Sequence, residues 1–429
     1  MLVVGSGGRE HVLTWRCGQD SAAHNLHAAP GNPGIATLAT CHSATPTGIS
    51  GLLDLADHLR PDLTIVGPEA SLAAGIVDAF HSRGFRIVGP TQQAARLESS
   101  KVFAKELMVR HGIPTAPFEV FERVDEALAY IRRAGRPLVV KADGLASGKG
   151  VVVTEHPDEA ERAVLEMMVR RVYGPAGARV LIEDRLAGEE ASVLALVHGT
   201  RVWPLPPARD YKRARDGDGG PNTGGMGAFA PAALAPALAA QIVDEVLEPV
   251  AAAMVSEGVP YTGVLYAGVM VTEDGPQVLE FNCRFGDPEA QVILPLLEGD
   301  FTSGLLAALG GEDPGLRWRN GAAVCVVLAS QGYPGSPAAG QAIAGLDRLP
   351  PGVLAFHAGT ALAGGALVTA GGRVLNVVGC GETPAGARAQ AYRGVAAIRF
   401  DGMQYRTDIA AETAGGGAAD LAAKAAVAG

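Results

Sequence analysis

The chain has 429 residues, 48% of them hydrophobic, and a formal net charge of −10 at pH 7. A chain of this length is typical of about three domains, and its hydrophobic content excludes a largely disordered protein. The negative charge disfavours a surface that coats nucleic acid. No apolar run approaches the roughly 20 residues that a transmembrane helix needs. We therefore expect a globular protein with neither nucleic acid nor a membrane as its partner.

The first residues and the cysteines bear on location. Charged side chains, Arg9, Glu10, Arg16 and Asp20 among them, interrupt residues 1–20, which excludes the apolar centre of a signal peptide. The five cysteines are scattered, contain no Cys-x-x-Cys pair and are odd in number. Reduced thiols in the cytoplasm fit this pattern best. We expect a cytoplasmic protein whose cysteines are structural.

Residues 1–99 alternate between short apolar stretches and segments of helical character. Strands are predicted at the apolar stretches "MLVVG", "NLHAA", "DLTIVG" and "FRIVG". Helices are predicted between them, over residues 9–19, 52–59 and 72–81. A strand, a glycine-rich turn and a helix that repeat in this order predict a doubly wound parallel sheet, with ligands at the strand ends.

The rest of the chain divides near residue 317. Residues 100–317 contain several predicted strands, the glycine-rich loop "LASGKG" and a helix predicted over residues 158–171. Residues 318–429 show short strands and turns with one or two helices, and few clustered charges. We expect an α/β fold throughout, with a structural domain or a lid as its last part.

The segment "GSGGRE" follows the first predicted strand and opens a helix. The dinucleotide-binding pattern G-x-G-x-x-G requires glycine where this chain has Glu10, and no acid ends the second strand to bind a ribose. Gly7 and Gly8 would instead let backbone amides approach an anion at the helix N-terminus, and Arg9 would add charge. An ordinary tight turn explains the segment equally well.

The segment "KADGLASGKGVVV" places Lys141 on a strand and Lys149 in a loop of small residues that leads into a second strand. The backbone amides of such a loop, together with a lysine, suit the phosphates of a nucleotide. The P-loop pattern G-x-x-x-x-G-K-[ST] is absent, and a strand rather than a helix follows. The alternative is a solvent-exposed hairpin.

The segment "VLIEDRLAGEEASV" carries Glu183, Leu186 and Glu190 after a predicted strand. Its backbone is suited to the edge of an adenine, and a carboxylate there is suited to ribose hydroxyls. Acids after a strand are usually only solvated, and the segment taken alone favours that interpretation.

A long glycine-rich segment over residues 208–229 has charges of both signs that lead into "GPNTGGMGA". We expect neither a helix nor a regular strand there, and a long irregular loop in a compact enzyme is usually functional. Its charged residues Asp210, Lys212 and Arg213 either form a solvated surface or face a ligand. The residues expected to form a ligand cradle are Asn222, Thr223, Gly224 and Gly225.

The segment "VLEFNCRFGDPEAQ" has the period of a strand with two unlike faces. Alternate residues of a strand share a face, so Glu280, Asn282 and Arg284 are predicted to project together. The apolar residues expected on the opposite, core-facing side are Phe281, Cys283 and Phe285. An acid, an amide and a permanent cation on one face indicate a charged ligand.

Together these segments resemble the glycinamide ribonucleotide synthetase family of the ATP-grasp superfamily. The matching stretches span residue 3 to about residue 300 in the family's order, and the later "FHAGT" also fits. They read "GSGGREH", "APGNPG", "TIVGPEA", "VVKADGLASGKGV", "GEEAS", "GPNTGGMGA", "YTGVLYAG" and "LEFNCRFGDPE".

The resemblance implies an N-terminal α/β domain over residues 1–99, an ATP-grasp domain over residues 100–317 and a C-terminal domain over residues 318–429. Within the second, residues from about 117 to 186 would form a small mobile subdomain that covers the nucleotide. The family's reaction joins glycine to 5-phosphoribosylamine while ATP becomes ADP and phosphate, in purine biosynthesis. We expect a glycyl phosphate intermediate and a monomeric enzyme.

The resemblance also implies the cofactor contacts, for ATP with Mg²⁺ and with Mn²⁺ as an alternative ion. Lys101 and Lys141 would neutralise phosphates, and the loop around Lys149 would close over them. Glu280 and Asn282 would supply oxygen ligands to the metal ion. The other residues expected to bind the nucleotide are Gly148, Gly150, Glu183, Leu186 and Glu190.

For the substrates, Arg284 would hold a carboxylate or acyl phosphate with its planar fork. Asp210 would orient the ammonium group of either glycine or the ribosylamine, and Lys149 completes the expected catalytic set. The residues expected to hold the phosphoribosyl group are Gly7, Gly8, Arg9, Asn32, Gly34 and Glu69. Further substrate contacts are expected from Lys212, Arg213, Asn222, Thr223, Gly224, Gly225 and Asp287.

Three alternatives stay open on sequence alone. Another ATP-grasp ligase or carboxylase would share the nucleotide site but differ in its acceptor. A nicotinamide-dependent oxidoreductase is disfavoured by Glu10 in the first glycine-rich turn. A nucleotide-binding regulator without turnover is disfavoured by the complete set of acid, amide and lysines, and ADP release would distinguish it.

Overall fold

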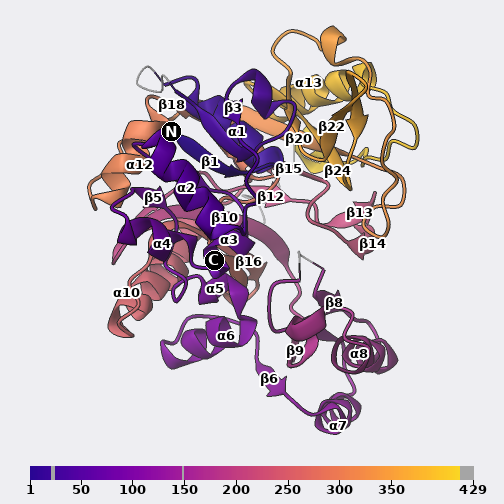
Figure 1. Ribbon diagram of the computed structural model, residues 1–429. Helices are drawn as coiled ribbons and strands as arrows, with labels where there is room; N and C mark the ends of the chain where they lie inside the picture. The colour runs from indigo at the N-terminus through magenta and orange to yellow at the C-terminus, as the bar shows by residue number, and fades with distance from the viewer. Residues whose placement is uncertain (21–24, 147–148, 416–429) are drawn as a thin grey trace.

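The computed structural model describes residues 1–20, 25–146 and 149–415. Figure 1 shows an N-terminal sheet domain beside a C-terminal domain, with a small subdomain projecting below both. Within the described ranges, no helix combines the length and the hydrophobicity needed to cross a bilayer.

The N-terminal sheet is entirely parallel and has the strand order β3-β2-β1-β4-β5. Its strands are β1 (Leu2–Gly5), β2 (His27–Pro30), β3 (Thr40–Cys41), β4 (Thr64–Val66) and β5 (Ile87–Val88). The helices are α1 (Gly8–Cys17), α2 (Ile49–Leu59), α3 (Glu69–Ala73), α4 (Ile76–Ser82), α5 (Arg96–Ser99) and α6 (Lys101–Arg110). The predicted parallel sheet is confirmed, and the helix expected over residues 72–81 is broken at Gly75, which has a left-handed φ of 88°.

The small subdomain is an antiparallel sheet, β6-β9-β7-β8, with two helices packed on it. Its elements are β6 (Phe118–Phe121), α7 (Val124–Ala134), β7 (Leu138–Ala142), β8 (Val151–Val153), α8 (Pro157–Val164) and β9 (Val180–Asp184). Buried apolar residues such as Ile131, Val140 and Ile182 give it a separate core. A separate core lets these residues fold as a unit attached to the central region.

The central sheet, β11-β10-β16-β17, is also antiparallel. Its strands are β10 (Glu189–His198), β11 (Arg201–Pro204), β16 (Thr262–Thr272) and β17 (Gly275–Asn282), and its helices are α9 (Pro236–Ile242), α10 (Glu248–Ser256), α11 (Ala290–Ile293) and α12 (Phe301–Leu309). The short pair β18 (Leu297–Glu298) and β19 (Arg317–Trp318) follows. One apolar core joins this sheet to the N-terminal domain, so the two do not pack independently.

The C-terminal sheet takes two strands from the middle of the chain. Its order is β12-β15-β20-β24-β21, with β12 (Arg209–Asp210) and β15 (Gly227–Ala230) at one side. The other strands are β20 (Ala322–Ala329), β21 (Leu354–His357) and β24 (Arg373–Gly381), with α13 (Pro384–Ala397) packed on the sheet and the hairpin of β22 (Thr360–Ala363) and β23 (Ala366–Thr369) beside it.

The glycine-rich segment over residues 208–229 was expected to be irregular, and that expectation is wrong. It forms β12, the hairpin of β13 (Arg213–Arg215) and β14 (Gly219–Asn222), and β15. The hairpin turns through Gly217 and Asp218, whose φ angles are 66° and 51°. Neighbouring strands supply hydrogen-bond partners that cannot be predicted from the local sequence. Glycine-rich residues can therefore still pair as strands.

Short turns of 3₁₀ or π type complete the secondary structure. They are η1 (Ile35–Thr37), η2 (Leu165–Val169), η3 (Gly174–Gly177), η4 (Val243–Leu247), η5 (Leu294–Leu296), η6 (Leu346–Arg348) and η7 (Ala411–Gly415). The helix predicted over residues 158–171 corresponds to α8 followed by η2.

Two histidines, His11, which is buried, and His357, which is half-buried, join the N-terminal and C-terminal domains. His11 on α1 is 6% exposed, and its Nδ1 accepts a hydrogen bond of 2.7 Å from the backbone N–H of His357. Burial, with a smaller effect of His357, lowers the pKa of His11 to about 3. Burial also lowers the pKa of His357 to about 4. The folded protein therefore holds both rings neutral.

We predict that His11 makes stability depend on pH in the acid range. Its folded pKa lies below the unfolded value of about 6.5, so its contribution is complete above pH 6.5 and is lost as pH falls toward 3. Between pH 7 and pH 5 the loss should be about 2 kcal/mol. His11→Asn, which keeps an acceptor, should show a correspondingly flatter dependence of the melting temperature on pH.

The exposed His81→Asn is the matched control and should keep the wild-type slope. An unchanged slope in His11→Asn would show that His11 does not resist protonation.

Candidate active site

An inner pocket of about 100 Å³ lies where the N-terminal, central and small sheets meet. Residues distant in sequence converge on it from α3, α5, α6, β7 and β17. Its charged and amide side chains are Glu69, Glu98, Lys101, Lys105, Lys141, Glu280, Asn282 and Arg284. The predicted grouping of Glu280, Asn282 and Arg284 with Lys101 and Lys141 is thus present in space.

Glu280 and Asn282 reach this pocket from the end of β17. Glu280 pairs with Gly268 and Asn282 with Tyr266 across the antiparallel ladder to β16. Phe281 between them is 2% exposed, so the predicted alternation of a polar and a core face is confirmed. The amide nitrogen of Asn282 donates to the Phe281 carbonyl at 2.9 Å. Its Oδ1 is therefore the atom with which it would bind a cation.

Cations hold the Glu280 carboxylate in its ionised form. Burial alone would raise the pKa of Glu280, but Lys212, Lys101 and Lys141 outweigh it and keep that pKa below its ordinary value. Burial lowers the pKa of Lys101 in turn, and Glu280 opposes this shift. Glu280 and Lys101 thus carry opposite charges that stabilise each other inside the small pocket.

Glu183 is committed to two lysines rather than turned toward solvent. It is 2% exposed, forms an ion pair of 2.5 Å with Lys105 and a second ion pair with Lys141. Lys141 also donates to the Leu279 carbonyl at 2.9 Å. Burial lowers the pKa of Lys105 to about 8, although Glu183 raises it. The carboxylate positions the lysines, and Glu190 and Leu186 are the more exposed members of the predicted nucleotide segment.

Arg284 follows the end of β17 and bridges two acids. Its Nη2 lies 3.0 Å from Glu98 Oε1, and its Nε lies 3.6 Å from Glu69 Oε2. Glu98 also accepts a hydrogen bond of 2.7 Å from the Cys283 N–H. Burial raises the pKa of Glu98, while Arg284 counteracts part of this effect. These two acids therefore hold the Arg284 guanidinium beside the pocket that Glu280 and Asn282 line.

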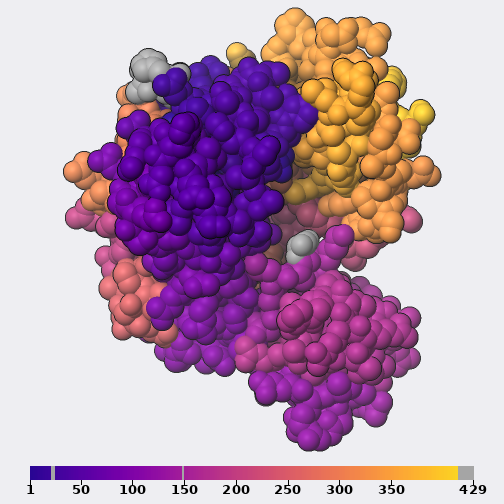
Figure 2. Space-filling model, viewed as in Figure 1, coloured from indigo at the N-terminus to yellow at the C-terminus, as the bar shows by residue number. Residues whose placement is uncertain are grey.

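A second, larger cavity of about 1100 Å³ lies between the small subdomain, the β13–β14 hairpin and the C-terminal domain. Figure 2 shows the hollow that separates the small subdomain from the C-terminal domain. Lys149 lines this cavity rather than the inner pocket, and its ammonium donates to the Pro334 carbonyl at 2.8 Å. Gly150 lies beside it and is buried, whereas Gly148 falls outside the described residues.

The hairpin places its polar residues in several positions. Arg213 and Asn222 line the larger cavity, and Asn222 Nδ2 donates to the Val151 carbonyl of the small subdomain at 3.4 Å. Thr223 is buried, and its hydroxyl donates to the Lys212 carbonyl at 2.8 Å. The Gly224 N–H donates to the hydroxyl of Tyr333 at 2.9 Å, and Gly225 is buried.

Asp210 and Lys212 stand at the start of that hairpin and carry opposite charges. Burial raises the pKa of Asp210 to about 7, with Lys212 opposing the shift. Lys212 donates to Glu190 Oε2 at 2.8 Å. Asp210, Glu190 and Glu280 together raise the pKa of Lys212 against the effect of burial. The pair is thus electrostatically connected to Glu280, and both residues are half-buried.

Several side chains of the predicted phosphoribosyl cradle are already used inside the protein. Asn32 donates to the Ser6 and His357 carbonyls, and its Oδ1 accepts from the Gly34 and Ile35 N–H groups. Arg9 donates to Glu10 and to the Phe285 carbonyl. The Gly7 N–H is also in use, because it donates to Glu10 Oε2. A ligand at this turn would therefore have to replace some of these internal contacts.

The C-terminal domain packs against the cradle, as a lid or closing domain would. Arg373 forms an ion pair of 2.8 Å with Asp287, and Gln291 donates to the same carboxylate at 2.6 Å. Burial alone would raise the pKa of Asp287, but Arg373, with smaller effects of Arg9 and Gln291, keeps that pKa below its usual range. Asn376 packs against Gly8. These contacts position Asp287 at the junction of three domains.

Sequence reasoning did not select several of the residues that shape the site. Glu98, Lys105, Asp143 and Arg373 are charged groups whose partners lie far away in sequence. Asp143 falls within the segment "KADGLASGKGVVV", and it accepts hydrogen bonds from Ser100, from the Val102 N–H and from Arg179. Lys105 lies on α6, which also carries Lys101, Glu106 and Arg110, so the charge of Lys105 does not single it out locally.

The donor set for a metal ion is small. Within the described ranges, no group of three or more His, Cys, Asp or Glu side chains is arranged around a common point. Glu280 and Asn282 supply a carboxylate and an amide oxygen, and Mg²⁺ commonly takes only a few protein oxygens together with phosphates and water. The residues present therefore fit a magnesium ion that arrives with a nucleotide.

Family models match almost the whole chain. The phosphoribosylglycinamide synthetase N domain matches residues 1–98, its ATP-grasp domain residues 99–290 and its C domain residues 323–412. The chain belongs to the phosphoribosylglycinamide synthetase family. Its resemblance to this family, and its α/β fold with an ATP-grasp core, are confirmed.

Individual relatives agree along their full lengths. The phosphoribosylamine–glycine ligase of Xanthomonas axonopodis pv. citri is 48% identical, over 95% of this chain and 96% of the relative. The crystal structure of the phosphoribosylamine–glycine ligase from Thermotoga maritima superposes with a TM-score of 0.84 at 36% identity, over 95% of this chain and 99% of that one.

A more distant structure shares the fold alone. The biotin carboxylase domain of 2-oxoglutarate carboxylase from Hydrogenobacter thermophilus has a TM-score of 0.72 at 17% identity, over 94% of this chain and 91% of that one.

We predict that Gly8 is required for packing between the first and last domains. A Cβ at this position would lie 2.1 Å from Asn376 Nδ2 and 2.8 Å from Gln291 Nε2, and both of these side chains are buried. Gly8→Ala should therefore destabilise the protein by about 1–3 kcal/mol, measured as a lower melting temperature.

Gly51→Ala on α2 is the control, because a Cβ there meets no atom within 4 Å. Alanine in an exposed helix should stabilise by about 0.5–1 kcal/mol. Equal melting temperatures for Gly8→Ala and the wild type would show that the contact with Asn376 is loose.

Proposed function

We propose that the chain joins glycine to 5-phosphoribosylamine to form glycinamide ribonucleotide, with ATP converted to ADP and phosphate. The observation that carries the proposal is the inner pocket, where Lys101, Lys141 and Arg284 surround Glu280 and Asn282. This pocket occurs in a chain of the phosphoribosylglycinamide synthetase family whose relatives named phosphoribosylamine–glycine ligase match it from end to end. The step belongs to purine biosynthesis.

The chemistry explains why the pocket needs so many charges. A carboxylate is a poor electrophile, so the glycine carboxylate oxygen first attacks the γ-phosphorus of ATP and ADP leaves. The amine nitrogen of phosphoribosylamine then attacks the carbonyl carbon of glycyl phosphate, phosphate leaves and the nitrogen loses a proton. Catalysis of phosphoryl transfer consists mainly of positioning and charge neutralisation.

The proposed division of labour follows from where the charges lie. Lys101 and Lys141 neutralise phosphate oxygens, and Arg284 holds the carboxylate and then the acyl phosphate. Asp210 orients an ammonium group of glycine or of the ribosylamine, close to the charge of Lys212. The loop with Gly148, Lys149 and Gly150 covers the phosphates when Lys149 leaves Pro334.

We further propose that Glu280 Oε and Asn282 Oδ1 bind Mg²⁺, for which Mn²⁺ can substitute. Such an ion neutralises the charge that develops on the phosphates. The Hydrogenobacter thermophilus domain was crystallised with magnesium ADP, and it has the same fold. The inner pocket is smaller than cavities that enclose a whole ligand, roughly 300–1,000 Å³. It would take the phosphate end of ATP, with Glu183, Leu186 and Glu190 toward the adenosine.

The phosphoribosyl group is proposed to bind where the first and last domains meet. Gly7 precedes α1 and Gly8 begins it, and backbone amides at a helix N-terminus favour an anion. The anion would replace the Glu10 carboxylate at the Gly7 N–H. Glu69 and Asp287 lie close to Arg284 and are suited to ribose hydroxyls. Arg9, Asn32 and Gly34 would support this turn, and Arg213, Asn222, Thr223, Gly224 and Gly225 would complete the substrate side.

The remaining proposals concern the whole protein. We propose a cytoplasmic monomer with small-molecule partners only, and with neither nucleic acid nor a membrane among them. Its proposed domains are residues 1–99, 100–317 and 318–429, with a nucleotide-covering subdomain over about 117–186.

The direct test measures ADP formation by the purified chain. ADP should appear only when glycine and phosphoribosylamine are both present, with no AMP. AMP among the products would exclude the acyl phosphate route, whereas turnover with bicarbonate in place of glycine would indicate a carboxylase.

We predict that Glu280→Gln lowers turnover about a hundred- to a thousand-fold, because a preorganised charge at the reacting phosphates is lost. ATP binding should weaken much less, since Lys101 and Lys141 remain. Turnover is measured across a magnesium titration. Glu273→Gln, in the exposed turn between β16 and β17, removes the same charge away from the pocket and should be neutral. Near-normal turnover of Glu280→Gln at low magnesium would exclude this metal site.

A further inference from the structure

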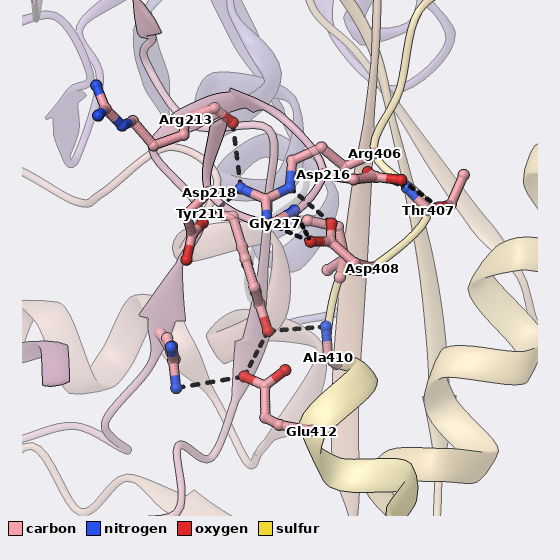
Figure 3. A network of polar contacts seen from close by, with 12 residues as sticks. Tyr211, Arg213, Asp216, Gly217, Asp218, Arg406, Thr407, Asp408, Ala410 and Glu412 are labelled. Atoms are coloured by element: carbon pink, nitrogen blue, oxygen red, sulfur yellow. Dashed lines mark hydrogen bonds and ion pairs between the residues drawn. The ribbon is translucent and has the colours of Figure 1, made fainter. Parts of the chain in front are cut away.

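Arg406 is a buried arginine that lines neither cavity. It is 1% exposed and lies in the segment after α13. Its Nε and Nη2 donate to the two carboxylate oxygens of Asp408, each at 2.7 Å. Its Nη1 donates to Asp218 Oδ1 at 2.7 Å and to the Arg213 carbonyl at 3.2 Å. Figure 3 shows this guanidinium at the centre of a network that connects two distant parts of the chain.

The contacts of Arg406 fall on both neighbours of Lys212. The guanidinium carbon lies 4.9 Å from the ring centroid of Tyr211, which precedes Lys212. The Arg213 carbonyl, which follows Lys212, accepts one of its hydrogen bonds. Because the residue before and the residue after are both held, the backbone of Lys212 has little freedom to shift.

The same C-terminal segment holds the hairpin turn. The Thr407 N–H donates to Asp216 Oδ1 at 2.8 Å, and the Gly217 N–H donates to Asp408 Oδ2 at 2.8 Å. Tyr211 donates to Glu412 Oε1 at 2.6 Å and accepts from the Ala410 N–H at 2.8 Å. Residues 406–412 thus bind the hairpin along its length.

The segment is itself anchored to α13. Arg388 donates to the Thr407 and Ile409 carbonyls, and Tyr392 donates to the Arg406 carbonyl at 2.8 Å. The hairpin is therefore attached to the core of the C-terminal domain rather than to another mobile loop.

We propose that Arg406 is a positioning residue that sets the place of Lys212, and through Tyr211 that of Asp210, in the active site. A buried arginine between two aspartates stabilises a fold little more than an apolar cluster of the same size would. Its contribution is to fix positions, because the planar guanidinium can bind the two carboxylates and the Arg213 carbonyl in only one arrangement. The catalytic consequence rests on the function proposed above.

The test compares Arg406→Lys with a matched variant, Arg16→Lys. Lysine keeps the charge but loses the fork. Arg16 is also buried, pairs with Asp20 at 3.0 Å and donates to the Gly299 carbonyl, away from both cavities. Arg16→Lys therefore controls for the loss of a buried arginine as such.

Arg406→Lys should raise KM about tenfold or more for at least one of glycine and phosphoribosylamine, because a small displacement of a positioning group is costly. The KM for ATP should stay within about twofold of the wild type, since Lys101 and Lys141 do not contact the hairpin. Arg16→Lys should lower the melting temperature and leave all three KM values unchanged. Unchanged KM values in folded Arg406→Lys would overturn the proposal.

A second measurement does not depend on activity. The hairpin offers trypsin the sites Lys212, Arg213 and Arg215, and Arg406→Lys keeps the number of sites in the chain constant. Each variant is digested at a temperature that lies the same number of degrees below its own melting temperature. Cleavage at the hairpin should then be faster in Arg406→Lys than in Arg16→Lys. Equal cleavage would overturn the positioning role, whereas faster cleavage in a chain without ligase activity would refute the proposed function alone.

Discussion

Burial of like charges in one small space is the constraint on which the site depends. Lys101, Lys105 and Lys141 lie together at the edge of the inner pocket, and unpaired ammonium groups there would cost several kcal/mol each. Glu183 neutralises two of them from β9, and Glu280 faces the third from β17. The small and central sheets are therefore connected by these electrostatic interactions as well as by the polypeptide chain. A polyphosphate would enter a pocket already arranged for negative groups, so little reorganisation is required when it binds.

The C-terminal domain completes the site through contacts that span the whole chain. Arg373 fixes Asp287, and the His357 carbonyl and N–H hold Asn32 and His11 of the first domain. Lys149 of the small subdomain reaches Pro334 across the larger cavity. A reactive acyl phosphate must be protected from water. A site assembled from every domain can be shielded on all sides, whereas one built on a single sheet would be open to solvent.

The sequence predicted the structural features that depend on residues close together in the chain. Strand alternation at Phe281 and the parallel order of the first sheet depend on neighbouring residues, and both are confirmed. The hairpin over residues 213–222 and the buried position of Glu183 depend on partners more than 30 residues away, Arg406 and Lys141 among them. An acid that pairs with buried lysines cannot be told from a solvated one by its own neighbours. The same holds for Arg406, whose segment carries no recognisable motif.

The two kinds of charged cluster have different physical tasks. In the inner pocket four cations, Lys101, Lys105, Lys141 and Arg284, are balanced by four acids, Glu69, Glu98, Glu183 and Glu280, so the cations are held at fixed places without an excess of positive charge. Around Arg406 the carboxylates of Asp218 and Asp408 outnumber the arginine, and Asp218 is exposed, so water can solvate its charge. Cations already held at fixed places suit the binding of phosphates, whereas an arginine with all its hydrogen bonds satisfied suits fixed geometry. The arrangement therefore separates the groups that must meet the substrates from those that only hold them, and Lys212 lies at the point where the two clusters meet.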